Sequence, residues 1–81
     1  MSGLAWSHTI VEEPDGTLRL EITDEDGAVL PVARQVTRPQ AEKLVQRISA
    51  EAETTNRPIK AVIRDPYFMA ATVITLKRLP E

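Results

Sequence analysis

The sequence predicts a small α+β domain: a four- or five-stranded, mostly antiparallel sheet with one helix packed on one face. Three observations support this class. Two Asp-Gly turns bracket an alternating stretch, an amphipathic pattern begins near Thr37, and two short apolar runs follow it. Alternation is typical of a half-buried strand, and apolar residues at i, i+3, i+4 and i+7 are typical of a helix. The predicted element order is therefore β-β-(β)-α-β-β.

The first two strands are predicted to form a β-hairpin. Residues 6–13 form the first run, and every second residue of 18–22 is apolar. Pro14-Asp15-Gly16 lies between them and favours a turn, because proline presets φ and glycine accepts positive φ.

A second turn and a possible third strand come next. Asp24-Glu25-Asp26-Gly27 forms the turn, and residues 29–36 follow it. Pro31 has no N–H to donate, so this strand suits only the edge of the sheet or a bulge.

The helix is predicted to begin at a capping box. Thr37 accepts from a first-turn N–H while Gln40 reaches back, and Pro39 loses little in the first turn. The helix should end near residues 54–56, because the residue before Pro58 is biased away from the α conformation. Its apolar stripe consists of Ala41, Leu44, Val45, Ile48 and Ala52.

The last two elements are predicted to be strands. Ile59–Arg64 and Ala70–Lys77 both alternate, and Asp65-Pro66-Tyr67 breaks the chain between them. The expected core packs Leu44, Val45 and Ile48 of the helix against apolar residues of three predicted strands, namely Leu18, Leu20, Ile22, Ile63 and Ile74.

The element order is similar to that of ubiquitin-like β-grasp folds, and a β-grasp-like mixed sheet is the alternative architecture. The Leu79-Pro80-Glu81 ending lacks the glycine pair of conjugated members, so the resemblance does not imply conjugation. One domain is expected over residues 1–81, with ragged termini at about 1–5 and 79–81.

The composition limits the chemistry. The 81 residues include no cysteine and one histidine, His8, so disulfides, thiolate metal sites and imidazole pairs are excluded. Self-association is then the remaining compensation for a small core, and a homodimer is one expectation. No run approaches the ~18 apolar residues of a membrane span, and the first residues do not resemble a signal peptide. A cytoplasmic location without a membrane partner is expected.

Charge is distributed unevenly along the chain. Residues 1–32 carry seven acids and one base, whereas residues 33–81 carry nine bases and five acids. Either the fold separates these segments and produces a dipole, or it interleaves them so that they neutralise each other.

Catalytic and metal-binding interpretations find no support in the residue patterns. With Gly27 as the sixth residue of a calcium loop, Ile22 and Ala33 occupy ligand positions, so the loop fails. Ser7 would point to the opposite strand face from His8, so no nucleophile–base pair forms there. We expect no enzyme activity, no cofactor and no metal.

Tyr67, Phe68 and Met69 are the candidate protein contacts, because three bulky residues in one short loop cannot all turn inward and such residues are enriched at interfaces. The alternative is that Phe68 and Met69 cap the core while Tyr67 lies at the rim. The predicted function is a small non-enzymatic protein–protein interaction module, as a homodimer or as a regulatory or accessory subunit.

Nucleic-acid binding is the alternative function. It would use bases of the predicted C-terminal strand pair beside a stacking tyrosine. The candidate residues are Arg57, Lys60, Arg64, Lys77 and Arg78.

Overall fold

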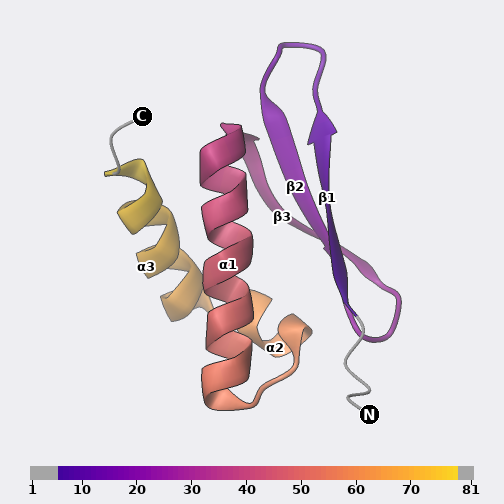
Figure 1. Cartoon of the computed structure of the whole chain (residues 1–81), viewed down its shortest axis with the longest axis vertical. Coiled ribbons are helices and arrows are strands. Elements are labelled where there is room, and N and C mark those ends of the chain that lie inside the picture. Colours follow the sequence, from indigo (N-terminus) through magenta and orange to yellow (C-terminus); the bar gives the residue numbers. More distant parts are fainter. Residues whose placement is uncertain (1–5, 79–81) are drawn as a thin grey trace.

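The computed structural model describes residues 6–78 as a three-stranded antiparallel sheet followed by three helices (Figure 1). The strands are β1 (Ser7–Glu12), β2 (Leu18–Thr23) and β3 (Val29–Val36), and the helices are α1 (Arg38–Thr55), α2 (Ile59–Ile63) and α3 (Pro66–Lys77). The predicted α+β class is confirmed. The termini predicted to be ragged, 1–5 and 79–81, lie outside the described residues.

The predicted hairpin is confirmed. β1 and β2 pair antiparallel, with Ser7 opposite Thr23 and Glu12 opposite Leu18. In the turn, Asp15 Oδ1 accepts the N–H of Thr17 at 2.9 Å, and Gly16 adopts a φ of 87°. The positive φ explains why glycine stands there.

The third strand is also confirmed, and it forms an edge of the sheet. β3 pairs with β2 alone, in the order β1-β2-β3, and the register shifts twice between Leu18 and Glu21. Gln35, in the irregular part of β3, has a φ of 55°. Pro31 therefore stands on an edge strand, where a missing N–H is tolerated.

Helix α1 has the predicted capping box and the predicted buried stripe. Gln40 N–H donates to Thr37 Oγ1 at 3.2 Å, and Thr37 N–H donates to Gln40 Oε1 at 3.0 Å. Asn56 ends the helix in the left-handed conformation. The buried residues are Ala41, Leu44 and Ile48.

The two strands predicted after this helix are wrong. Residues 59–63 and 66–77 form α2 and α3, so the sheet has three strands rather than four or five, and three helices rather than one follow it. The β-grasp-like mixed sheet is wrong for the same reason, because it also needs strands after α1. The physical reason lies at Asp65-Pro66, where Asp65 is the N-cap and Pro66 takes the first helical turn. Aspartate is favoured at the N-cap and proline at the first helical position, so this pair begins a helix instead of separating two strands.

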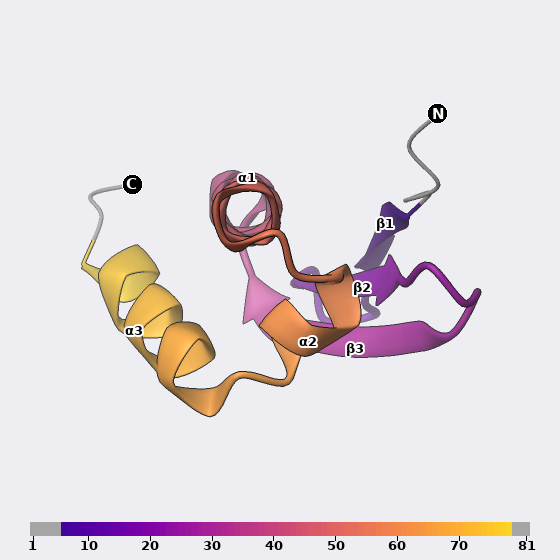
Figure 2. The same cartoon turned by 90° about the horizontal axis from the view of Figure 1, so that it is seen from below.

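The helices form a layer beside one face of the sheet. In Figure 2, α1 is seen nearly end-on between α3 and the sheet, and α2 lies in front of β3. The buried core joins all three helices to β2 through Leu20, Ile22, Leu44, Ile48, Ile59, Val62 and Leu76. Ile74, predicted for the core, is instead 52% exposed. No helix within residues 6–78 combines the length and apolar character needed to cross a membrane.

Candidate functional site

The predicted contact residues lie in the first turn of α3 rather than in a loop. Tyr67 is 87% exposed, whereas Phe68 and Met69 are half-buried and pack against the core. Two of the three candidates therefore contribute to packing, and Tyr67 alone faces outward.

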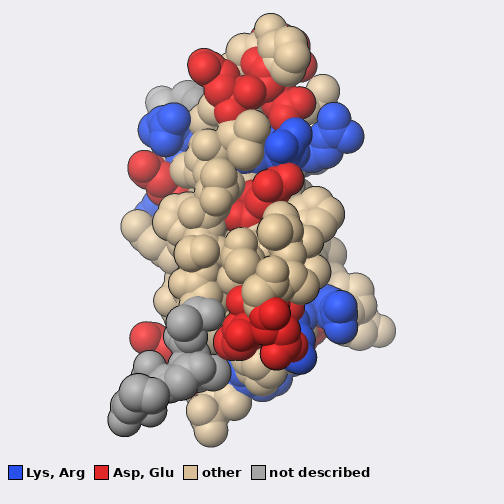
Figure 3. All heavy atoms as spheres, turned by 90° about the vertical axis from the view of Figure 1, so that its right-hand side faces the viewer, with Lys and Arg blue, Asp and Glu red and all other residues tan. Residues whose placement is uncertain are grey.

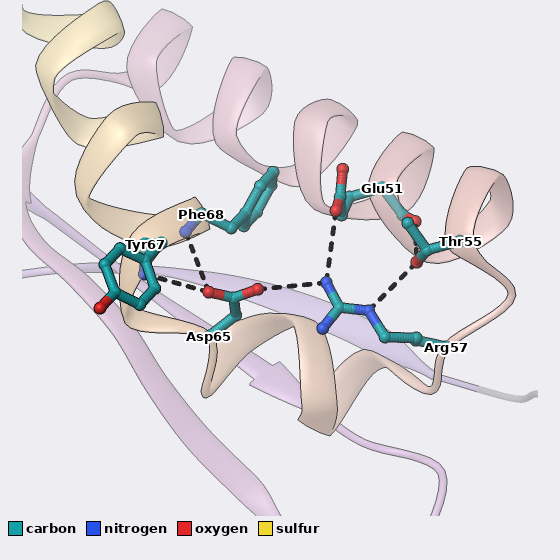
Figure 4. Close-up of polar contacts among 6 residues, drawn as sticks. All are labelled: Glu51, Thr55, Arg57, Asp65, Tyr67 and Phe68. Carbon is teal, nitrogen blue, oxygen red and sulfur yellow. Dashed lines mark hydrogen bonds and ion pairs between the residues drawn. The ribbon is translucent and has the colours of Figure 1, made fainter.

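Asp65 holds this first turn in place. Its Oδ1 accepts the N–H of Tyr67 at 3.0 Å and the N–H of Phe68 at 3.1 Å. The hydrogen bond from Phe68 is the main reason that the pKa of the Asp65 carboxyl is lowered, and the nearby Arg57 lowers it further. In Figure 4 the Phe68 ring lies beneath α1, while the Tyr67 ring points away from it.

Arg57 ties the start of α3 to the end of α1 (Figure 4). Its Nη2 lies 3.3 Å from Glu51 Oε2 and 3.4 Å from Asp65 Oδ2, and its Nε donates to Thr55 Oγ1 at 3.2 Å. Both carboxylates flank one guanidinium, so the direction in which α3 leaves α2 is set by charged contacts as well as by packing.

The outer face of α3 is apolar. Tyr67, Ala70, Ala71 and Ile74 are all exposed and follow helical spacing. Lys77 is the one charged residue among the twelve of α3. A helix with apolar residues on all sides is typically buried on all sides. α3 instead packs against α1 and α2 on one side, and its other side is exposed. We call this face, Tyr67–Ala70–Ala71–Ile74, the α3 stripe.

Two shallow grooves flank the C-terminal half of α3, each about 300 Å³ in volume. We name them the β3 groove and the α1 groove after the element that forms the other wall. Neither lining contains an Asp or a Glu. The β3 groove is lined by residues 32–36, Gln40, Leu44, Val73, Leu76 and Lys77. The α1 groove is lined by Lys43, Gln46, Arg47, Ala50, Thr75 and Leu76.

The five bases predicted for nucleic-acid binding do not form one surface. Lys60 Nζ lies 2.6 Å from Asp26 Oδ2, and Arg57 is engaged by two carboxylates as above. Arg64, Lys77 and Arg78 are exposed, and no ion pair within residues 6–78 includes them. Arg64 and Arg78 flank opposite ends of α3, whose 12 residues span about 18 Å at 1.5 Å per residue. The strand pair that should have gathered them does not exist.

The acidic N-terminal segment contacts the basic C-terminal segment at the turn between β2 and β3. Besides the Lys60–Asp26 pair, Glu25 Oε2 accepts the N–H of Ile59 at 2.8 Å. Elsewhere the acids remain on the sheet. Figure 3, which faces the sheet side of Figure 1, shows acidic side chains gathered near the top and the bottom of the view.

The remaining candidate chemistry is sparse. His8 is exposed on β1, and the part of the chain in the structure contains no cluster of three or more His, Cys, Asp or Glu residues that could hold a metal ion. A hollow of about 420 Å³ lies beside Trp6, with the carboxylates of Glu25 and Glu53 and the side chain of Arg57 in its lining.

Ile74 and the two alanines are site residues that the sequence interpretation missed. The signal was present: an N-cap aspartate and a proline precede a run without acids.

No protein-family model, curated protein or solved structure matches this chain. Its function is therefore inferred from the side chains and grooves described above.

Proposed function

We propose that the protein is a non-enzymatic protein–protein interaction module and that its contact surface is the α3 stripe. The observation that carries this proposal is the mismatch between the composition of α3 and its packing. Apart from Thr72, Thr75 and Lys77 the helix is apolar, but it is covered by its own chain on one side only. An exposed apolar surface of this kind is what a partner can bury.

The stripe has features of an interface centre. Tyr67 supplies a large, amphipathic ring, and tyrosine is enriched among residues that dominate binding energy. Ala70 and Ala71 lie in the middle of the stripe, where small side chains let another backbone approach closely. The contacts of Asp65 and Arg57 hold the first turn in place before any partner arrives, which lowers the entropy lost on binding.

The proposal includes a homodimer or an accessory subunit of a larger assembly, in a cytoplasmic setting. Nucleic-acid binding is less well supported, because two of its five candidate bases, Arg57 and Lys60, are paired with carboxylates. Phe68 and Met69 are no longer contact candidates in this proposal, since their substitution would disturb the core.

Site-specific photo-crosslinking in the cells that express the protein tests the stripe. The photoreactive residue benzoylphenylalanine would replace Ala71, and in a matched variant it would replace Val29, an exposed apolar residue in β3 that is 59% exposed. We expect a discrete protein adduct from position 71 that disappears with Ile74→Ser. The absence of an adduct at 71, or the same adduct from position 29, would refute the proposal.

Sedimentation of the purified protein separates the two kinds of partner. A concentration-dependent dimer that Ile74→Ser dissociates identifies a second copy, whereas a monomer together with the adduct identifies a different protein.

A further inference from the structure

Building on the proposed function, we infer that the partner of the α3 stripe is a different protein that presents an extended acidic segment in which Asp or Glu alternates with apolar residues. The inference comes from what surrounds the stripe: two grooves whose charged residues are all basic, one of which, the β3 groove, also has mainly apolar walls.

Five cations surround the C-terminal half of α3. Arg34 and Lys77 line the β3 groove, Lys43 and Arg47 line the α1 groove, and Arg78 ends the helix. All five are exposed, and none belongs to an ion pair among the described residues. The charge of this surface is therefore available to a partner.

No acid within residues 6–78 forms an ion pair with this surface, although Arg34 lies near Asp15. Hydrogen bonds from Thr17 chiefly lower the pKa of the Asp15 carboxyl, and Arg34 lowers it further. α3 contains no acid, and neither do the linings of the grooves.

In the helix layer, Glu51 and Asp65 are both held by Arg57, whereas Glu42 is exposed on α1 next to Lys43 and belongs to no ion pair among the described residues. A ligand with carboxylates would meet cations that no carboxylate of these residues holds in an ion pair.

The shape of the β3 groove fits an extended chain. Five consecutive residues of β3, 32–36, form one wall, and Val73 and Leu76 of α3 lie across from them. β3 is paired on one side only, so its other edge offers main-chain groups to an added strand. In an extended segment, alternate side chains point to opposite sides. Apolar side chains could then enter the groove while the acidic ones meet Arg34 and Lys77.

A second copy of this chain fits less well, because its own acids are largely engaged. Asp24 accepts two N–H groups of its turn, Glu25 accepts from Ile59, and Asp26 pairs with Lys60. Glu13 is bound by Arg19. A nucleic acid fits less well too, since its phosphates would gain nothing from the methyl groups of Val32, Val73 and Leu76.

Fluorescence anisotropy with three labelled peptides tests the inference. The first is three repeats of Asp-Leu-Glu-Phe, the second replaces the acids with lysine, and the third replaces the apolar residues with serine. We expect the first to bind the full chain at least about tenfold more tightly than either control, and to weaken as salt rises. Equal binding of the three peptides, or none by the first, overturns the inference.

Charge-matched variants locate the binding. Lys77→Glu and Arg34→Glu should each weaken the first peptide at least about fivefold, whereas Arg64→Glu, at the other end of α3, should leave its affinity within about twofold. An equal loss in all three variants would mean attraction to net charge alone and would overturn the assignment to the groove.

Phosphatidylserine vesicles, a DNA duplex and sedimentation of the protein at different salt concentrations test the competing partners. Tighter binding to phosphatidylserine vesicles or to a DNA duplex than to the first peptide would overturn the inference, as would a salt-sensitive dimer. Failure here stays distinct from failure of the proposed function: if only the inference is wrong, the adduct from position 71 persists in Lys77→Glu and is still lost in Ile74→Ser.

Discussion

Helices α1 and α3 begin alike and differ in what they leave exposed. Each starts at a side-chain N-cap with a proline in its first turn, Thr37 in α1 and Asp65 in α3. α1 then separates its faces, with Leu44 and Ile48 buried on the sheet and charged residues outside. α3 is apolar on both faces, and Ile74 remains half exposed. The apolar stripe of α1 is covered within the fold, whereas the α3 stripe stays exposed to solvent.

The difference shows that helix formation and helix burial depend on separate features of the sequence. A cap and a proline specify where a helix begins, whereas the period of the apolar residues specifies which side is covered. α3 has the first feature and lacks a polar face. Stability should therefore be concentrated along α1, and the outer side of α3 should contribute to binding instead.

The largest effect should come from the buried stripe of α1. Leu44→Ala, at 1% exposure, removes core contacts with β2 and should lower the free energy of unfolding by about 2–5 kcal/mol. Urea denaturation measures this loss. Glu42→Ala, an exposed position on the same helix, is the control and should change little. Similar midpoints for the two variants would contradict the assigned core.

A smaller effect should follow from removing the cap of α1. Thr37→Ala leaves the N–H of Gln40 without its side-chain acceptor and should destabilise the protein by about 1 kcal/mol. Thr37→Ser retains the acceptor and should restore most of the loss. If serine and alanine give the same urea midpoint, the hydrogen bond is not what stabilises this end of the helix.

Because the N-cap of α3 is the carboxylate of Asp65, its contribution to stability should depend on pH. The pKa of Asp65 is lowered in the folded state, so its charge stabilises the fold above the unfolded pKa of about 3.9, and this stabilisation is lost as pH falls through the folded value. Asp65→Asn keeps an acceptor but removes the charge that faces Arg57.

The urea midpoint of the wild type should therefore exceed that of Asp65→Asn at neutral pH, and the gap should narrow on acidification below about pH 4. Carboxylates that do not contact Arg57 have the same surroundings in both proteins, so their effects cancel in the difference. A gap that stays constant with pH would show that the charge of Asp65 contributes nothing to folding.

The first half of the fold could be predicted from the sequence because its signals are local and agree with one another. Turn residues and alternation specify β1, β2 and β3, and a capping box with a long stripe specifies α1. The second half could not be predicted in the same way. Residues 59–63 and 70–77 are short runs rich in β-branched residues, and alternation in so few positions does not separate a strand from a helix.

The sequence identifies residues 67–69 as candidate contacts, but it does not predict that they lie on a helix. At least one of the three bulky residues is predicted to face outward, and Tyr67 does, while Phe68 and Met69 pack against the core as in the alternative interpretation. Phe68 and Met69 turned inward because a helix, unlike a loop, directs consecutive side chains about 100° apart. The pairing of Arg57 with Asp65 and of Lys60 with Asp26 depends on contacts between elements, which no local pattern encodes.

The smallest effect on stability should come from the stripe itself, and it is the most direct test of the contrast within α3. Ile74→Ser and Leu76→Ser make equivalent changes two residues apart in one helix, so chain position and helix propensity are nearly matched. Leu76 is 5% exposed and Ile74 is 52% exposed. Ile74→Ser should therefore change the free energy of unfolding by less than about 0.5 kcal/mol, while Leu76→Ser should lower it by at least about 2 kcal/mol. Urea denaturation of the purified protein separates these outcomes. Equal losses would mean that the outer face is needed for folding, and an interface assigned to it would then lose its physical basis.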